Sequence, residues 1–153
     1  MIATLITDWV DSVLSAIDKT KGFYTSPDIS HSFADKPADM SELASPLLII
    51  ETTDNPVNQV PTGQRVESIQ LSRKVYINGF IPVPDGERPS DHLDRLLFDV
   101  RKAIYPTPKQ LSNNTTFQIQ ETEARYLYPQ VGSKVARFVL AFNFIHHENF
   151  KEG

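Results

Sequence analysis

One stretch of the chain decides the fold: residues 134–146, which read KVARFVLAFNFIH. Alternate side chains of a β-strand point to opposite faces, and here both alternating sets are largely apolar. One set consists of Phe138, Leu140, Phe142 and Phe144, and the other of Val135, Val139, Ala141 and Ile145. A strand that is apolar on both faces is either central in its sheet or covered by another subunit. These residues therefore predict the core strand of a sheet.

Three further strands are expected around this one, at residues 117–128, 67–82 and 46–51. The first is joined to the core strand by the turn-forming residues 129–133, so the two should form a hairpin. In the second, apolar residues share one parity, but Arg73 and Gly79 break the apolar face and favour a bend or bulge. The third is short and buried, and it ends at the turn cluster 54–56.

Two segments have the spacing of an amphipathic helix. Within residues 2–17 apolar side chains recur at i, i+3 and i+4, and Gly22 stands where a C-terminal cap belongs. A second helix is expected over residues 90–104, with Ser90 as its N-cap and Pro106 just beyond its end.

The order of elements is helix, strands, helix, hairpin, which predicts an α+β fold. We expect a largely antiparallel (mixed) sheet with the two main helices packed on one face, in a single domain covering residues 1–153. Most of the eleven prolines fall in the connections, against six glycines in the whole chain, and proline stiffens such segments. The long proline-containing loops are residues 54–63 and 82–89, and one helical turn is expected within residues 36–43.

The composition excludes several classes of site. Fifteen Lys and Arg against 19 Asp and Glu give a net charge of −4, which argues against nucleic acid or an anionic membrane as the main partner. The absence of cysteine excludes disulfides, zinc–thiolate sites, iron–sulfur clusters and thiol nucleophiles. The longest apolar run, residues 47–50, is far shorter than the ~20 residues that cross a bilayer. Because no targeting segment is visible, we expect an intracellular protein.

No catalytic, cofactor-binding or metal-binding residue can be assigned from the sequence. The glycines form neither a phosphate-binding loop nor a nucleophile elbow. His146 and His147 are adjacent on a strand, so they should face opposite sides and not share a metal, although Glu148 leaves a fortuitous surface site open. We expect that the chain is not an enzyme and takes no cofactor.

Two carboxylate pairs have simpler explanations than catalysis. Asp91 and Asp94 lie near the positive end of a helix dipole. Glu121 and Glu123 should share one strand face, as an acidic strip that faces solvent or a lumen. The basic residues are spread over several elements and interleaved with acids, as expected of a solvated or subunit-contacting surface.

In its order of elements the chain resembles the tail terminator (tail completion) proteins of long-tailed bacteriophages, also called minor tail proteins. The resemblance rests on the opening amphipathic helix and on three further pieces. These are the strand at 45–50, the long strand at 72–80 that leads through a loop into the helix at 91–100, and the closing strand at 135–144. They are patterns of element order and not catalytic motifs, so no functional residue is carried over.

The resemblance implies a structural role in the virion. Such proteins assemble as a hexameric ring on the finished tail tube, stop its polymerisation and provide the surface that joins the head. The implied partners are further copies of the chain, the tail tube protein, a neck or head-completion protein and, in a contractile tail, the sheath protein. DNA would only pass through a lumen that is usually acidic. The chain would be assembled in the bacterial host cytoplasm and reside in the tail or neck, without a membrane partner.

Two other functions stay open. A different neck component, such as a head-completion or connector-adaptor protein, fits less well because adaptors tend to be helical and dodecameric. A small ligand-binding α+β domain or enzyme is the alternative from another class, since a fold does not fix a function. We expect subunit or tube contacts at residues 54–63 and 82–89, whose prolines lower the ordering cost of binding. Plain surface turns are the simpler interpretation of both loops.

Overall fold

The computed structural model describes residues 1–31, 47–60, 63, 65–129 and 134–150. The helical elements are α1 (Ile2–Ser15), the short 3₁₀ turn η1 (Lys19–Lys21) and α2 (Pro89–Ile104). The strands are β1 (Ile29–Ser30), β2 (Leu47–Glu51), β3 (Asn55–Pro56), β4 (Ser68–Pro82), β5 (Gln118–Leu127) and β6 (Val135–Asn149). The helical turn expected within residues 36–43 and residues 130–133 of the hairpin connection lie outside the described residues.

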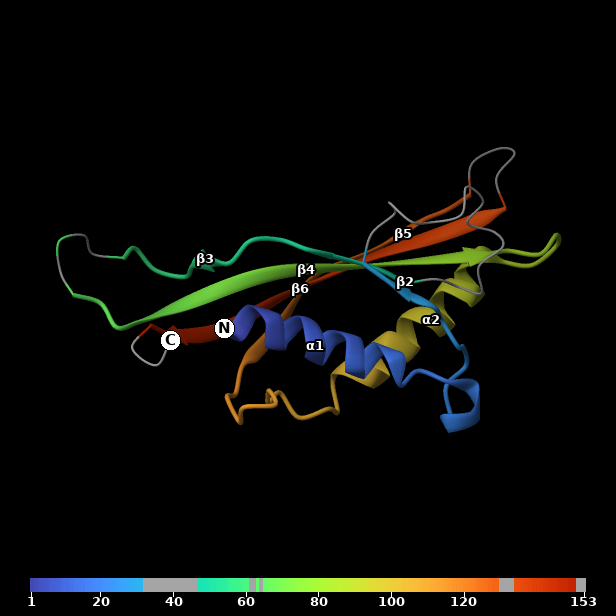
Figure 1. Cartoon of the computed structure of the whole chain (residues 1–153). Helices are drawn as coiled ribbons and strands as arrows, with labels where there is room; N and C mark the ends of the chain where they lie inside the picture. The colour runs from blue at the N-terminus through green and yellow to red at the C-terminus, as the bar shows by residue number, and fades with distance from the viewer. Residues whose placement is uncertain (32–46, 61–62, 64, 130–133, 151–153) are drawn as a thin grey trace.

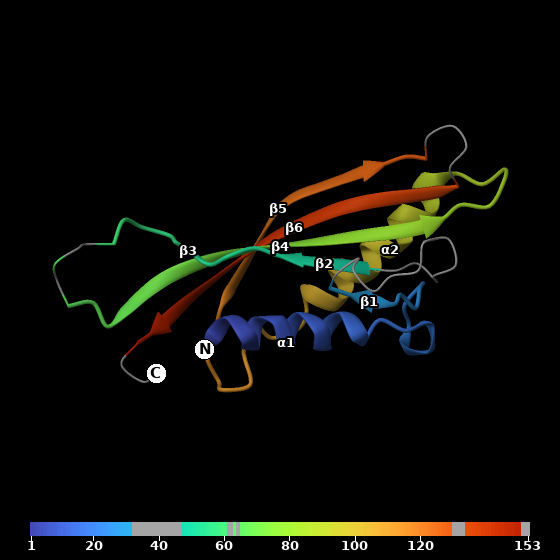
Figure 2. The ribbon, with the colours of Figure 1, turned by 45° about the horizontal axis from the view of Figure 1, so that its top comes forward.

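The strands form one mixed sheet, and the predicted α+β fold is confirmed. The strand order is β1-β2-β4-β6-β5, and β3 pairs with a separate part of β4. Within the described ranges the β1–β2 pair is parallel and every other pair of neighbouring strands is antiparallel. Both helices lie on the same side of the sheet (Figure 1 and Figure 2), and their apolar faces join the sheet in one hydrophobic core.

The core strand β6 is central, which decides between the two explanations for its apolar faces. It lies between β4 and β5 and pairs with β4 without interruption from Val135↔Pro82 to Asn149↔Ser68. Phe138, Phe142 and Phe144 are fully buried, as members of the core beneath the helices. Val139 and Ala141 alternate with them and are buried as well. Val135 and Ile145, on the same face as Val139 and Ala141, are half-buried.

Gly79 marks a close contact between strands, and the bulge expected on this strand does not occur. The β4–β6 register passes through Arg73 and Gly79 without a shift. Gly79 is opposite Phe138, and a Cβ placed at Gly79 would lie 2.3 Å from Cε2 of the Phe138 ring. Glycine in a strand indicates either a bulge or a close approach, and here the aromatic ring occupies the space that a side chain would need.

Two helix ends differ from prediction. α1 ends before its expected cap, and Gly22, with a φ of 90°, terminates η1 instead, because the side chain of Asp18 caps that separate turn. α2 begins at Pro89, and its N-cap is Arg88 rather than Ser90. Proline suits the first helical position because its fixed φ is helical and the first N–H has no partner within the helix.

Replacing Gly79→Ala should lower the free energy of unfolding by about 1–3 kcal/mol, because the new methyl group overpacks the core against Phe138. Urea unfolding followed by circular dichroism measures the loss. The double variant Gly79→Ala/Phe138→Leu provides the control, since a smaller residue 138 relieves the collision and the two changes should be less than additive. Strict additivity would show that the Phe138 ring is not the cause.

Candidate interaction surfaces

The adjacent histidines face opposite sides of the sheet, as predicted. His146 pairs with Leu71 on the helix-covered face and is 1% exposed, whereas His147 is exposed. Glu148 does not form a site with either histidine: its Oε2 accepts the backbone N–H of Ile2 at 3.1 Å. Within the described residues no group of three or more His, Cys, Asp or Glu side chains could hold a metal ion. No helix in that part of the chain combines the length and apolar character needed to span a membrane.

Glu121 and Glu123 lie on opposite faces, so the prediction of one acidic strip is wrong. Glu121 is opposite Phe142 of β6, and Glu123 is opposite Ala141, the next residue along the same strand. One residue, Thr122, is therefore extra in β5, and such a bulge reverses the alternation of side chains beyond it.

Glu121 joins β5 to α2 through a hydrogen-bonded network. Arg101 donates from Nε and Nη2 to its two carboxylate oxygens at 3.0 and 2.8 Å, and the Tyr105 hydroxyl donates to Oε1 at 3.0 Å. The hydrogen bond from Arg101 lowers the pKa of Glu121. Further along the same seam the Tyr126 hydroxyl donates to Asp94, and burial together with this bond raises the pKa of Tyr126. These carboxylates hold the helix on the sheet.

A buried carboxylate holds the segment after η1 against α2. Asp99 is fully buried and accepts the backbone N–H groups of Tyr24 and Thr25 at 3.1 and 2.7 Å. These bonds fix the backbone at Tyr24, whose side chain is 60% exposed and lies with its ring edge-on to Phe98 at 5.8 Å between centroids. Phe98 is itself 52% exposed. Sequence reasoning missed Asp99 because its partners are main-chain groups about 75 positions away, which no side-chain pattern records.

We call this surface the aromatic patch: Tyr24, Phe98 and the two cations beside them, Lys19 and Arg95. Lys19, Tyr24 and Arg95 line one cavity of about 350 Å³. Neither the Lys19 ammonium nor the Arg95 guanidinium forms a hydrogen bond or ion pair with any residue of the described ranges. The patch therefore combines exposed aromatic rings with cations that the described part of the chain does not neutralise.

At the other end of the sheet, β4 and β6 continue past the helices as an arm (Figure 1 and Figure 2). The arm comprises residues 55–60, 65–72 and 145–150. Part of the connection predicted as a turn is here the strand β3, which pairs with β4. The Val57 N–H donates to the Gln70 carbonyl at 3.0 Å, and the Phe150 N–H to the Glu67 carbonyl at 2.7 Å. Pro56 is tolerated in β3 because a strand at the edge of a sheet does not need every backbone N–H for pairing.

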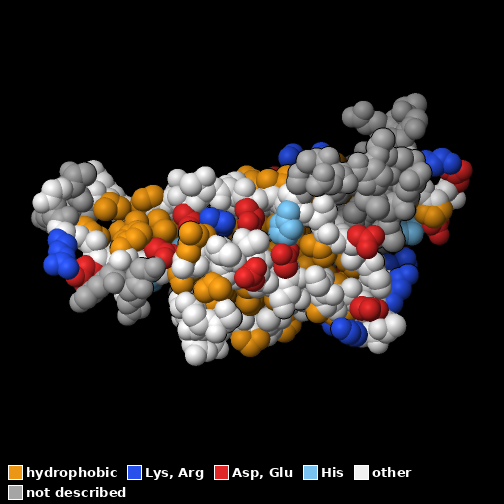
Figure 3. All heavy atoms as spheres, viewed as in Figure 1, with side chains coloured by type: hydrophobic (Ala, Val, Ile, Leu, Met, Phe, Trp, Pro, Cys, Tyr) orange, Lys and Arg blue, Asp and Glu red, His pale blue; other side chains and the backbone are white. Residues whose placement is uncertain are grey.

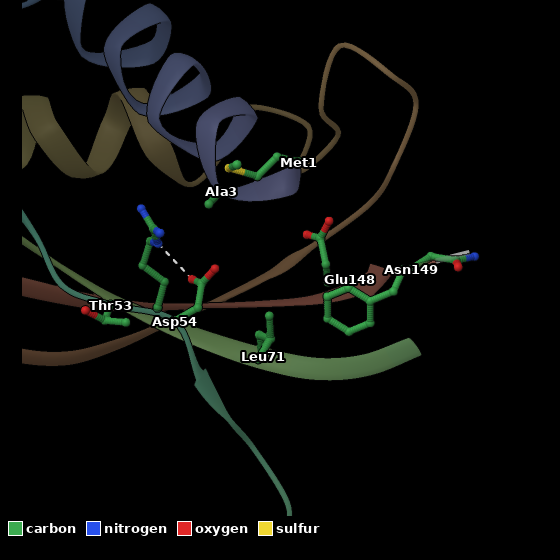
Figure 4. Close-up of a pocket in the computed structure, with 9 residues that line it drawn as sticks. Met1, Ala3, Thr53, Asp54, Leu71, Glu148 and Asn149 are labelled. Carbon is green, nitrogen blue, oxygen red and sulfur yellow. Dashed lines mark hydrogen bonds and ion pairs between the residues drawn. The ribbon is translucent and has the colours of Figure 1, made fainter. Parts of the chain in front are cut away.

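The arm and the start of α1 enclose a groove of about 510 Å³ (Figure 4). Its apolar lining comes from Met1, Ala3, Leu71 and Phe150, and its polar lining from Thr53, Asp54, Arg73, Glu148 and Asn149. Of these, Phe150 is 56% exposed. In Figure 3 hydrophobic side chains gather on the same arm. A concave surface with apolar walls and a few charges is suited to receive an apolar side chain of a partner.

The charges of the groove are engaged with one another. Arg73 Nε donates to Asp54 Oδ1 at 2.8 Å, and Arg73 Nη1 lies 3.7 Å from Glu51 Oε2. Glu51 also accepts the hydroxyl of Thr7 on α1 at 2.8 Å. His146 Nε2 lies 3.5 Å from Asp54 Oδ1, and neither ring nitrogen has a hydrogen bond to a described residue. This cluster joins α1 to the base of the arm and does not present an acid–base pair to the groove.

The second proline-containing connection, residues 82–89, is anchored at both sides of its turn. The Val83 N–H donates to the Lys134 carbonyl at 2.7 Å, and Val83 is buried. Gly86, with a φ of 82°, makes the turn, and Glu87 lies 2.9 Å from Nε2 of His92. The predicted contact role of this loop stays a prediction.

Replacing Glu121→Gln should lower the free energy of unfolding by about 0.5–1 kcal/mol at neutral pH, because the bidentate bond from the half-exposed Arg101 is weakened. A lowered pKa in the folded state stabilises the fold above the ordinary value of 4.5. The difference from the unmodified chain should therefore shrink as the pH falls below that value. Urea unfolding at pH 7 and pH 3 measures both effects.

The matched control is Glu123→Gln, on the opposite face of the same strand. Glu123 pairs with Arg125 at 2.9 Å, but both side chains are exposed to solvent by more than a third. Its replacement should change the free energy of unfolding by less than about 0.5 kcal/mol. Equal losses for the two variants would contradict the separation of the two carboxylates by the bulge.

Comparison with known proteins identifies no family for this chain. No protein-family model matches it, and no curated protein matches it. Among solved structures 23 chains match. One of them is 14% identical in sequence and aligns over 94% of this chain and 94% of its own length, with a TM-score of 0.53. That likeness concerns the fold alone.

Proposed function

We propose that the chain is a structural subunit of a bacteriophage tail, the terminator that caps the tail tube as a ring. The observation that carries this proposal is the arm, in which β4 and β6 remain paired beyond the part of the sheet that the helices cover. An arm of this kind adds surface without adding core. It exposes Val57 and Phe150, and apolar groups gathered on an exposed projection are typical of a protein–protein interface.

The specific role of tail terminator is inferred from the order of helices and strands in the sequence. In the proposed assembly six copies form a ring that ends tube polymerisation and offers the head-joining surface. The ring would contact the tail tube protein on one side and a neck or head-completion protein on the other, with the sheath protein added if the tail is contractile. The chain would then be part of the virion, and DNA would pass through the lumen of the ring.

A small ligand-binding domain is the alternative with an observation of its own. The groove volume of about 510 Å³ falls within the range of roughly 300–1,000 Å³ that is typical of small-molecule sites. A different neck component would share the arm and the partners, and it differs from the terminator in where it binds.

The decisive experiment adds tail tubes to the purified chain and examines them by electron microscopy and native mass spectrometry. The proposal expects a six-fold ring at the end of each tube, and tubes that no longer elongate. A chain that is monomeric without tubes agrees with this result, because ring formation can require the tube. A chain that never binds tubes but binds or converts a small molecule would refute the proposal.

Deleting residues 58–60 from the arm should leave the fold intact but abolish docking on tubes. The three residues follow Val57, whose N–H donates to the Gln70 carbonyl of β4, and they are not among the buried core residues. Circular dichroism and the Tm check folding, and co-sedimentation with tubes checks docking. Normal tail completion by the folded, shortened chain would show that this connection is an ordinary surface loop.

A further inference from the structure

The groove and the aromatic patch lie at opposite ends of α1. Met1 and Ala3, at the start of the helix, line the groove, whereas Lys19 and Tyr24, just after its end, belong to the patch. A helix of this length extends about 21 Å at ~1.5 Å per residue. Figure 1 shows the arm and η1 at the two ends of the molecule. The two surfaces therefore cannot meet within one copy.

The aromatic patch has the composition of an interface centre. Exposed aromatic and arginine side chains dominate the binding energy of protein interfaces, and the patch has Tyr24, Phe98 and Arg95 together. The Asp99 carboxylate accepts the backbone N–H groups of Tyr24 and Thr25 and so holds this part of the main chain in place before any partner arrives. A segment already ordered in this way loses less conformational entropy on binding.

The groove complements the patch in both shape and charge. It is concave and apolar at Leu71 and Phe150, where an aromatic ring can enter. Asp54 and Glu148 line the groove; Arg73 is paired with Asp54 and Glu51, whereas Glu148 accepts the backbone N–H of Ile2. Three carboxylates therefore stand against one guanidinium, that of Arg73. The patch offers the ammonium and guanidinium groups of Lys19 and Arg95.

We propose that the aromatic patch of one copy docks in the groove of a second copy, so that subunits associate head to tail. Phe98 and Tyr24 enter the apolar groove beside Phe150, and Lys19 and Arg95 face its carboxylates. Such a heterologous contact leaves a free patch and a free groove at the ends of every dimer, so further copies add, and a rotation between copies that closes gives a ring instead of an open filament. This inference rests on the proposed function, because it assigns the interface of the ring.

Two variants, each altered at one of the two surfaces, test the interface. Phe98→Asp disables the patch and Phe150→Asp disables the groove, and both positions are more than half exposed, so the fold should survive. Each variant alone should be monomeric by native mass spectrometry under conditions where the unmodified chain forms rings. A one-to-one mixture should form dimers and nothing larger, because only one patch and one groove remain intact in each pair.

Cross-linking tests the same contact on assembled rings, because the chain contains no cysteine of its own. A mixture of Phe98→Cys and Phe150→Cys copies, assembled on tail tubes and oxidised, should yield a disulfide-linked dimer. Either variant alone should yield none. The matched control mixes Phe98→Cys with Ile50→Cys, which is similarly exposed but lies on β2, and should also yield none.

The outcomes of these experiments distinguish a failure of the head-to-tail interface from a failure of the proposed function. Rings formed by either Asp variant, a mixture that stays monomeric, or a cross-linked dimer from Phe98→Cys alone would each overturn the head-to-tail contact while leaving the terminator role intact. An unmodified chain that assembles neither alone nor on tubes would overturn both.

Discussion

The uninterrupted antiparallel pairing of β4 with β6 is the constraint on which the rest of the structure depends. Every other strand except β1 pairs directly with one of these two, and both helices pack on the face that they create. The pairing needs a small residue where the two strands come closest, and Gly79 provides it beneath the ring of Phe138. A bulge at Gly79 would have reversed the faces of the β4 residues beyond it.

The length of this pair also produces the surfaces on which the proposed function depends. On the helix-covered face, apolar side chains continue up to Val75 on β4 and Phe144 on β6, and Arg73 and His146 follow toward the arm. The change from apolar to charged residues marks where the cover of the helices ends. Arg73 binds the carboxylates of Glu51 on β2 and of Asp54, just before β3. Ion pairs of limited exposure add little stability, but they favour the strand register in which the charges meet over shifted registers. The groove forms beside this transition.

Periodicity along the sequence was sufficient to predict the two long strands, the two helices, and the packing of both helices on one face of the sheet. It failed where a single residue changes the geometry: Thr122 adds a bulge, Asn55 and Pro56 form an edge strand, and Pro89 shifts a helix start. The groove and the patch could not be predicted, because each combines residues far apart in the chain. Met1 and Phe150 line the same groove because β4 pairs with β6. Tyr24 lies against Phe98 because the Asp99 carboxylate accepts the backbone N–H of Tyr24.

Asp99 gives the clearest physical reason to look for function on the surface of this chain. A buried carboxylate costs several kcal/mol unless hydrogen bonds compensate it, and this one is compensated by the main chain of residues 24 and 25. That segment supplies the partly buried Phe23 to the core, but it leaves Tyr24 largely in solvent. Packing Phe23 does not require the next side chain to be held against Phe98. An ordered segment that carries an exposed aromatic side chain lowers the entropy cost of association, so the arrangement supports the proposed interface.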